Sequence, residues 1–299
     1  MSAALWAGLL SCTTRQTADA DAASTTKTSD ITIENVGFAT PESVLYDAAA
    51  DVYLVTNING SPLEKDDNGF VSRVSPDGSI SSLEWIAGTQ DDVSLNAPKG
   101  MAITNGVLYI ADIDAVRMFD AADGTPKGSI EIAGATFLND VTVGNDGLVY
   151  VSDSGLKAGA SGFEPSGTDA VYRINSDKSV EKLAEGDALG RPNGLVPAGA
   201  DLLVVTFGSG EVYRLSRDGK RHNVLKPPGG ALDGVVALPD GTFLMSSWEA
   251  KSLFVMKADG SFETVATGLE SPADIGFDSK RKRVLVPLFL VNKVVLKSL

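Results

Sequence analysis

The chain has 299 residues, of which 43% are hydrophobic, and its 39 acidic residues outnumber its 25 basic ones to give a formal net charge of -14 at pH 7. This length and apolar content allow a substantial buried core, whereas the negative charge opposes phosphate backbones and anionic lipid surfaces and argues against nucleic-acid binding. A single cysteine, Cys12, and a single histidine, His222, exclude a disulfide framework, a cysteine-rich zinc site and a site with several histidines. Carboxylates and amides must therefore supply the chemistry, and His222, which lies in a polar run, receives no role.

The first thirty residues differ in composition from the rest of the chain. An apolar run over residues 3–10 is too short to span a bilayer, and it leads through Leu9-Leu10-Ser11-Cys12 into a polar stretch rich in Thr, Ala, Ser and Asp. This pattern resembles the end of a bacterial lipoprotein signal, in which Cys12 would carry the lipid and the polar stretch would be a tether. No Lys or Arg precedes the apolar run, so the alternative is a frayed terminus. We expect residues 1–30 to be a leader and tether of an exported, periplasmic or cell-surface lipoprotein, and residues 31–299 to form one domain.

From Ile31 onward the sequence consists of short β-branched runs separated by tight-turn dipeptides, without a long stretch of helical periodicity. Asp-Gly and Asn-Gly are the strongest local signals for a β-hairpin. They occur at Asp77-Gly78, Asn105-Gly106, Asp123-Gly124, Asp146-Gly147, Asp218-Gly219, Asp240-Gly241 and Asp259-Gly260. The domain is therefore predicted to be all-β.

A four-residue phrase recurs along the domain. Its six copies are Pro41-Glu42-Ser43-Val44, Pro98-Lys99-Gly100-Met101, Leu138-Asn139-Asp140-Val141, Pro192-Asn193-Gly194-Leu195, Leu232-Asp233-Gly234-Val235 and Pro272-Ala273-Asp274-Ile275. The second residues of these phrases follow one another at intervals of 57, 40, 54, 40 and 40 residues, a period expected of four-stranded propeller blades. Six phrases predict a six-bladed β-propeller.

The last unit is short, since only 27 residues follow Pro272. That length is enough for about three strands, so we expect residues 31–36 to return as the outermost strand of the last blade. Such closure would remove an exposed sheet edge and join the two ends of the domain.

The two long intervals contain insertions at residues 59–69 and 156–169. Each insertion follows the second strand of its blade, which places it at the mouth of the channel where the phrases begin. Both are rich in Gly, Ser, Asp, Glu and Pro, a composition that fits tolerated surface loops as well as the walls of a substrate pocket.

The second residues of the phrases are predicted to form a ring at the channel mouth. They are Glu42, Lys99, Asn139, Asn193, Asp233 and Ala273. Four of them offer side-chain oxygens, and Ca²⁺ takes about six to eight oxygens, which would leave positions for water or substrate. The alternatives are ordinary turn formers or a water-filled polar channel, but buried carboxylates without a partner would be costly.

These phrases resemble those of the senescence-marker-protein/gluconolactonase family, which includes luciferin-regenerating enzyme and is related to the paraoxonases and other calcium lactonases. The resemblance covers nearly the whole chain after the leader. It implies that Glu42, Asn193 and Asp233 bind a metal ion, and that Asn139 contacts substrate or completes the coordination shell. It also implies Ca²⁺ as the usual ion, with Zn²⁺, Mn²⁺ or Mg²⁺ as substitutes, and hydrolysis of a small-molecule lactone or ester.

Two positions depart from the family pattern. Phe137 stands where sugar-lactone members carry Arg, which favours a less polar substrate. Lys99 stands near the position of a His in paraoxonase-type enzymes, which argues against histidine-assisted hydrolysis.

Roles follow for the remaining candidates. We expect Asp233 to be the general base, with Asp140 or Asp274 as a substitute. Lys99 would hold an acidic product or pair with a channel carboxylate, and Trp248 would be either a pocket wall or an aromatic packed between blades. The competing hypothesis is a non-catalytic, lipid-tethered propeller that binds a ligand or protein around a structural ion.

Overall fold

The computed structural model describes residues 1–2, 29–160 and 162–299. These residues form six four-stranded antiparallel sheets and one separate two-stranded hairpin, with two short 3-10 helices at Asp187–Leu189 and Phe289–Val291. The prediction of a six-bladed β-propeller is confirmed. No helix in the described ranges has the length and apolar character that a membrane span requires. Cys12 and most of the predicted leader lie outside the described residues, so the lipoprotein assignment stays a prediction.

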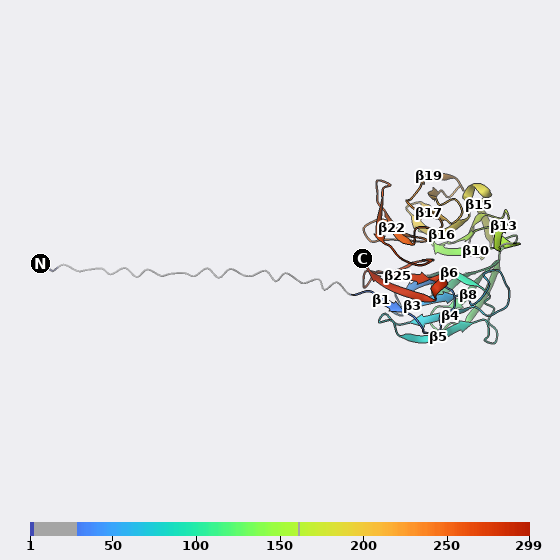
Figure 1. Cartoon of the computed structure of the whole chain (residues 1–299), viewed down its shortest axis with the longest axis horizontal. Helices are drawn as coiled ribbons and strands as arrows, with labels where there is room; N and C mark the ends of the chain where they lie inside the picture. Colours follow the sequence, from blue (N-terminus) through green and yellow to red (C-terminus); the bar gives the residue numbers. More distant parts are fainter. Residues whose placement is uncertain (3–28, 161) are drawn as a thin grey trace.

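The blades follow one another in chain order (Figure 1). Blade one contains β2 (Pro41–Asp47), β3 (Val52–Asn57), β4 (Phe70–Val74) and β5 (Ile80–Ala87). Blade two contains β6 (Pro98–Thr104), β7 (Val107–Asp112), β8 (Ala115–Asp120) and β9 (Pro126–Glu131). Blade three contains β10 (Leu138–Val143), β11 (Val149–Asp153), β14 (Ala170–Ile174) and β15 (Val180–Glu185).

The second half of the chain repeats this arrangement. Blade four contains β16 (Pro192–Ala198), β17 (Asp201–Thr206), β18 (Val212–Leu215) and β19 (Arg221–Leu225). Blade five contains β20 (Leu232–Ala237), β21 (Phe243–Ser247), β22 (Ser252–Met256) and β23 (Phe262–Ala266). Blade six contains β24 (Gly276–Asp278), β25 (Arg283–Leu288), β26 (Lys293–Ser298) and the N-terminal β1 (Ile31–Ile33).

The N-terminal strand closes the propeller as predicted. β1 pairs antiparallel with β26, with Ile31 opposite Leu296 and Ile33 opposite Val294, and Figure 1 shows this strand beside the C-terminal end of the chain. The strand is shorter than the predicted residues 31–36, because Asn35 and Gly37 have positive φ values that turn the chain away from the sheet.

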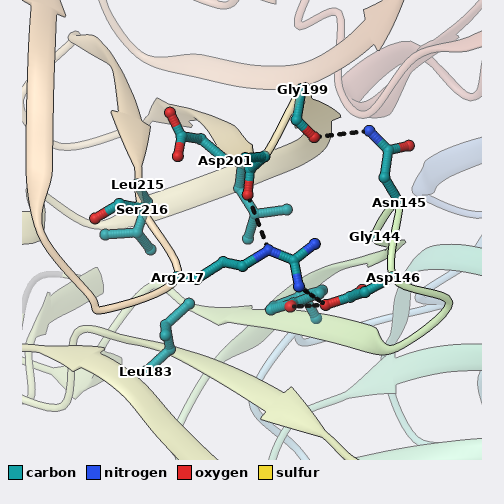
Figure 2. A pocket seen from close by; sticks show the side chains of 12 residues that line it. Gly144, Asn145, Asp146, Leu183, Gly199, Asp201, Leu215, Ser216 and Arg217 are labelled. Atoms are coloured by element: carbon teal, nitrogen blue, oxygen red, sulfur yellow. Dashed lines mark hydrogen bonds and ion pairs between the residues drawn. The ribbon is translucent and has the colours of Figure 1, made fainter.

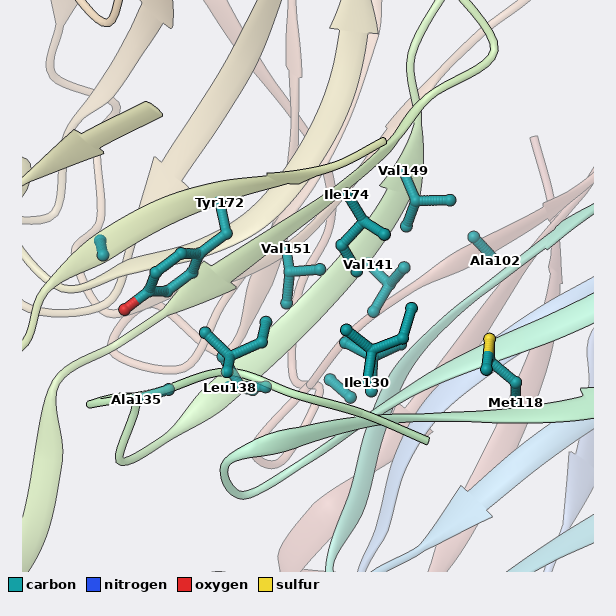
Figure 3. Packing of buried hydrophobic residues seen from close by; sticks show 14 residues of the cluster. Ala102, Met118, Ile130, Ala135, Leu138, Val141, Val149, Val151, Tyr172 and Ile174 are labelled. Atoms are coloured by element: carbon teal, nitrogen blue, oxygen red, sulfur yellow. The ribbon is translucent and has the colours of Figure 1, made fainter. Parts of the chain in front are cut away.

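A hydrophobic cluster fills each of the six interfaces between blades. The cluster between blades two and three is typical: Met118 and Ile130 of blade two pack against Val141, Val151 and Tyr172 of blade three (Figure 3). Because successive side chains of a strand point to opposite faces of its sheet, each blade supplies an apolar face to both neighbours. The core is therefore divided among the interfaces, and the centre of the molecule is left to polar side chains.

The first five phrases each contain a β-bulge. In blade one, Pro41 pairs with Asn57 and Val44 pairs with Val55, so Glu42 and its neighbour together oppose the single residue Thr56. The innermost strands of blades two to five shift register at the same two positions. A bulge bends its strand and redirects a side chain, and this is how the fold turns the second residue of these five phrases toward the channel.

Candidate active site

A cavity of about 290 Å³ lies at the channel mouth, and five of the six predicted ring residues line it. These five are Glu42, Lys99, Asn139, Asn193 and Asp233. The sixth, Ala273, is buried outside the cavity and has no side-chain donor atom. The other lining residues are Ile58, Gly60, Pro62, Phe137, Ser154, Leu156, Phe163, Phe207, Trp248, Phe289 and Leu290. The cavity thus has a polar floor and walls that are almost entirely apolar.

Hydroxyl groups on the second strands hold the bulged phrases in place. The Ser152 hydroxyl accepts a hydrogen bond from the Asp140 N–H at 3.0 Å and donates to the Asn193 carbonyl of the next blade at 2.7 Å. The Ser246 hydroxyl repeats this in blade five, accepting from the Gly234 N–H at 2.9 Å. Backbone groups that the bulge releases from the strand ladder are thereby paired, which fixes the ring residues on rigid strands.

Four oxygens of the floor are buried and have no hydrogen-bond partner. They are Glu42 Oε2, Asn139 Oδ1, Asn193 Oδ1 and Asp233 Oδ1. Their side chains belong to residues no more than 6% exposed. Buried polar atoms in native proteins are almost always paired, because an unpaired one costs about 1–3 kcal/mol. Four unpaired acceptors, one from each predicted metal ligand, indicate a missing positively charged or donating partner.

Two carboxylates and two amide oxygens suit a hard cation such as Ca²⁺, which binds through oxygen and tolerates irregular geometry. Carboxylates alone do not form the site: within residues 29–160 and 162–299, no three His, Cys, Asp or Glu side chains are grouped closely enough to hold an ion. The amides of Asn139 and Asn193 are therefore essential to the fit. With four protein oxygens, a bound ion would keep coordination positions for other ligands.

Burial and mutual repulsion disfavour the ionised carboxylates of this floor. Burial raises the pKa of Glu42 well above its usual value, and the charges of Asp233 and Asp274 raise it further. Burial likewise raises the pKa of Asp233, with Asp274 adding to the effect and the neighbouring Trp248 and Asn193 side chains opposing it. A cation among these groups would favour their charged forms and relieve the repulsion.

Lys99 is a buried cation at the edge of the floor. Its Nζ donates to the Ala97 carbonyl at 3.0 Å and to the Pro62 carbonyl at 3.5 Å, and lies 4.5 Å from the centre of the Phe137 ring. Burial lowers its pKa, and the charge of Glu42 opposes that change. None of the ion pairs among the described residues includes Lys99, so the expected pairing with a channel carboxylate is not seen.

Asp140 and Asp274, proposed as bases, lie apart from the cavity. Both line a second cavity of about 380 Å³. This cavity is formed by residues of the innermost strands that come after the second residue of each phrase. The Asp140 carboxylate accepts hydrogen bonds from the N–H groups of Val141 and Leu195, each at 2.7 Å, and Asp274 accepts from the Ser43 hydroxyl. Asp140 thus links blades three and four, and this placement does not support the predicted catalytic role for it.

The sequence analysis singled out Trp248 but missed equivalent wall residues in other blades. In each blade, the first phrase residue pairs with the last residue of the second strand, as Pro192 does with Thr206. The residue that follows is Ile58, Ser154, Phe207, Trp248 or Phe289 in the five blades where it lines the cavity. The repeat period could have identified this second ring.

The wall is an aromatic cluster around Trp248. Its ring centre lies 5.7 Å from that of Phe207 and 5.3 Å from that of Phe289. Trp248 is therefore both a pocket wall and a packed aromatic, and the two interpretations of this residue are compatible.

Both insertions contribute to the cavity, as one of their two interpretations predicted. The first supplies Gly60 and Pro62. The second forms the hairpin β12 (Leu156–Gly159) and β13 (Gly162–Pro165), whose Phe163 packs edge-on against Phe137 with ring centres 6.3 Å apart.

The hollow in Figure 2 and the side chain of His222 do not form a comparable site. The gap in Figure 2 holds only about 10 Å³, and its polar groups are paired, as in the bond from Arg217 Nη1 to Asp146 Oδ2 at 2.6 Å. His222 lies on the outer strand β19, half-exposed and 3.1 Å from Asp201. It is not among the residues that line the cavity.

No protein-family model and no curated protein sequence matches the chain. Solved structures share its fold. A gluconolactonase from Xanthomonas campestris, important in glucose secondary metabolic pathways, has a TM-score of 0.66 and 21% identity, covering 87% of this chain and 86% of the other. Luciferin-regenerating enzyme has a TM-score of 0.63 and 12% identity, covering 91% and 98%.

A third similar structure is a catalytically inactive His-to-Ala variant of virginiamycin B lyase from Staphylococcus aureus with quinupristin, at a TM-score of 0.58 and 14% identity, covering 91% of this chain and all of the other. The resemblance to the gluconolactonase family is confirmed at the level of the propeller fold. Identities this low establish the fold alone.

Proposed function

We propose that this protein is a divalent-metal-dependent hydrolase, with Ca²⁺ as the preferred ion, that opens a lactone or a related ester at the channel mouth. The observation that carries the proposal is the set of four unpaired, buried oxygens on the floor of an open cavity. A structural ion would be enclosed by protein, whereas this floor faces a space large enough for a small molecule.

Glu42, Asn139, Asn193 and Asp233 would hold the ion, which would supply Lewis-acid polarisation of a substrate carbonyl. Among the described residues that line the cavity, Asp233 and Glu42 are the two that carry carboxylates. Asp233 lies beside Trp248 and Asn193, and we assign it the role of accepting a proton from the attacking water.

Lys99 adds a positive charge at the same floor. Its two hydrogen bonds to backbone carbonyls leave one N–H of the ammonium group for a substrate oxygen. No carboxylate pairs with it among the described ion pairs, so its charge would favour the negative oxygen that develops as the acyl carbon is attacked.

The similarity to a streptogramin-type lyase suggests elimination as another reaction class, but this chain offers no histidine for it. The lyase variant that lacks one histidine is catalytically inactive, and the sole histidine here, His222, lies on an outer strand. Hydrolysis through carboxylate and amide groups therefore fits this cavity better.

A panel of lactones and aryl esters, assayed on chelated and then Ca²⁺-restored protein, tests the proposal. We expect turnover only with the ion, and a loss of about a hundredfold or more in Asp233→Asn and Asn193→Ala proteins that keep their melting temperature. The control is Asp240→Asn, in an exposed turn of the same blade as Asp233. Undiminished turnover by chelated protein or by folded Asp233→Asn would reject the mechanism.

A further inference from the structure

The chemistry of the cavity wall narrows the class of molecule that fits above the floor. Trp248 contacts Phe207 and Phe289 in one aromatic cluster, and Phe137 with Phe163 forms a second. These segments come from blades three to six and from the second insertion, so two aromatic clusters line the same cavity as the polar floor.

Few hydrogen-bonding groups of the wall are free. The Ser154 hydroxyl is occupied, because it accepts from Asn139 Nδ2 at 2.9 Å and donates to the Pro192 carbonyl at 2.8 Å. The Trp248 Nε1 donor is buried and has no partner among the described residues. Asp233 lies beside this donor, which lowers the pKa of its carboxyl group, so the wall offers a ligand almost no hydrogen-bonding group of its own.

A polyhydroxylated ligand would fit this wall poorly. Each sugar hydroxyl placed against it would give up its hydrogen bonds to water without replacement, which weakens binding about tenfold or more for each group. A hydrocarbon group gains instead, by about three- to fourfold in affinity for each methylene buried.

The apolar surface continues past the cavity rim. Phe163 and Leu290 both line the cavity, yet are 57% and 63% exposed. Exposed apolar side chains that extend a pocket lining mark a binding surface more readily than scattered ones do. A chain longer than the cavity could lie along these two residues.

We propose that the substrate is a lactone or ester with one compact oxygen-bearing head group and a hydrocarbon remainder, an alkyl chain or an aryl ring, and that polyhydroxylated sugar lactones are excluded. This inference rests on the proposed hydrolase function, because only a hydrolase would turn this ligand over as a substrate. The head group lies on the polar floor, and the hydrocarbon part lies against the aromatic side chains of the wall.

Two measurements on the Ca²⁺-loaded full chain test the proposed substrate class. The first compares kcat/KM for δ-lactones with alkyl substituents of one to seven carbons and for glucono-δ-lactone. The second measures binding of the corresponding six-membered lactams, which resist hydrolysis, by quenching of tryptophan fluorescence. We expect affinity and kcat/KM to rise about threefold for each added methylene until the cavity is filled, and glucono-δ-lactone to be the poorest substrate.

A wall variant separates the cavity from general hydrophobic association. Phe207→Ala should cut the gain for each methylene to less than twofold, and should weaken binding of the longest-chain lactam more than that of the unsubstituted one. Val224→Ala, on the exposed outer strand β19 of the same blade, should change neither value. Thermal melting of both proteins shows whether they are folded.

The outcomes distinguish this inference from the hydrolase proposal. Chain-length-dependent lactam binding without turnover would support the ligand class and reject the hydrolase. Metal-dependent turnover with glucono-δ-lactone preferred would support the hydrolase and reject the ligand class. The proposed ligand class would also be rejected if lactam affinity did not depend on chain length. The same holds if that affinity changed equally in Phe207→Ala and Val224→Ala.

Discussion

Ser154 is not a proposed metal ligand, but it positions two residues that are. Its hydroxyl holds the amide of Asn139 by accepting from Nδ2, which leaves Oδ1 as the unpaired acceptor on the floor. Because the same hydroxyl donates to the Pro192 carbonyl, it also fixes the backbone that precedes Asn193. Two of the four proposed ligands thus depend on one positioning residue.

Removing this hydroxyl should weaken ion binding more than folding. In Ser154→Ala the amide of Asn139 can rotate, and we expect Ca²⁺ affinity to fall about 10- to 100-fold, as measured by calorimetric titration. Ser154→Thr keeps the hydroxyl and should restore most of the affinity. Equal Ca²⁺ affinity in wild type and Ser154→Ala would contradict the positioning role.

At the scale of elements, hairpins of different blades share one type of turn. An Asp side chain accepts a hydrogen bond from the N–H two residues later, as in Asp77 with Ser79 at 3.0 Å and Asp240 with Thr242 at 3.0 Å. The residue between is glycine with positive φ, 89° at Gly78 and 84° at Gly241. Glycine is favoured there because left-handed backbone clashes with a Cβ atom.

The turn between β14 and β15 breaks this rule. Asp177 and Ser179 make the same hydrogen bond at 2.9 Å, but the residue between them is Lys178 with φ of 68°. We expect Lys178→Gly to raise the free energy of unfolding by about 0.5–1 kcal/mol, since relief of the left-handed strain exceeds the entropy that glycine adds to the unfolded chain.

Gly241→Ala is the matched control, because nothing lies within 4 Å of the position its Cβ would take. It should destabilise by about 1 kcal/mol through backbone strain alone. Urea denaturation at fixed Ca²⁺ measures both proteins, and loss of stability in Lys178→Gly would count against this explanation.

At the scale of the whole molecule, stability depends on joining blade six to blade one. The Asp274 N–H donates to the Glu42 carbonyl at 2.9 Å across this joint. Further out, Arg281 of blade six binds both oxygens of Asp51 in blade one, at 2.7 and 2.8 Å, and also the buried Asp278 at 3.0 Å. The joint therefore combines backbone hydrogen bonds near the site with a peripheral ion-pair cluster of Arg281, Asp51 and Asp278.

This ion-pair cluster predicts that the stability of the fold decreases at acidic pH. The hydrogen bonds from Arg281 and Lys280 lower the pKa of Asp51. For Asp278, burial raises the pKa, but bonds from Tyr53 and Arg281 outweigh it and leave the pKa lowered. A lowered carboxyl pKa contributes stability that is complete above the unfolded value of about 4 and is lost as pH falls through the folded value.

Arg281→Met should therefore be less stable than wild type at pH 7, and the gap should narrow as pH falls below about 4. Lys251→Met, which breaks the exposed pair with Glu270, is the control and should change little at any pH. Urea denaturation across pH 3–7 gives the comparison. A gap of constant size would show that Arg281 acts by packing instead.

The fold and four of the site residues could be predicted from the sequence because both are tied to a repeat. The phrase period counts the blades, and its second residues identify Glu42, Asn139, Asn193 and Asp233 as one ring. Strand closure followed from the short last unit, since a propeller with an open edge is unfavourable. Local hairpin chemistry and a fixed period are properties that a sequence carries directly.

Only the tertiary structure decided what lies above and beside that ring. Asn139 and Asp140 are adjacent in sequence, yet a bulge sends one to the cavity and the other to a contact between blades. Phe207 and Phe289 become a wall because strands from different blades end at one mouth. Contacts across the channel depend on how six sheets twist and close together, and no short stretch of sequence contains that geometry.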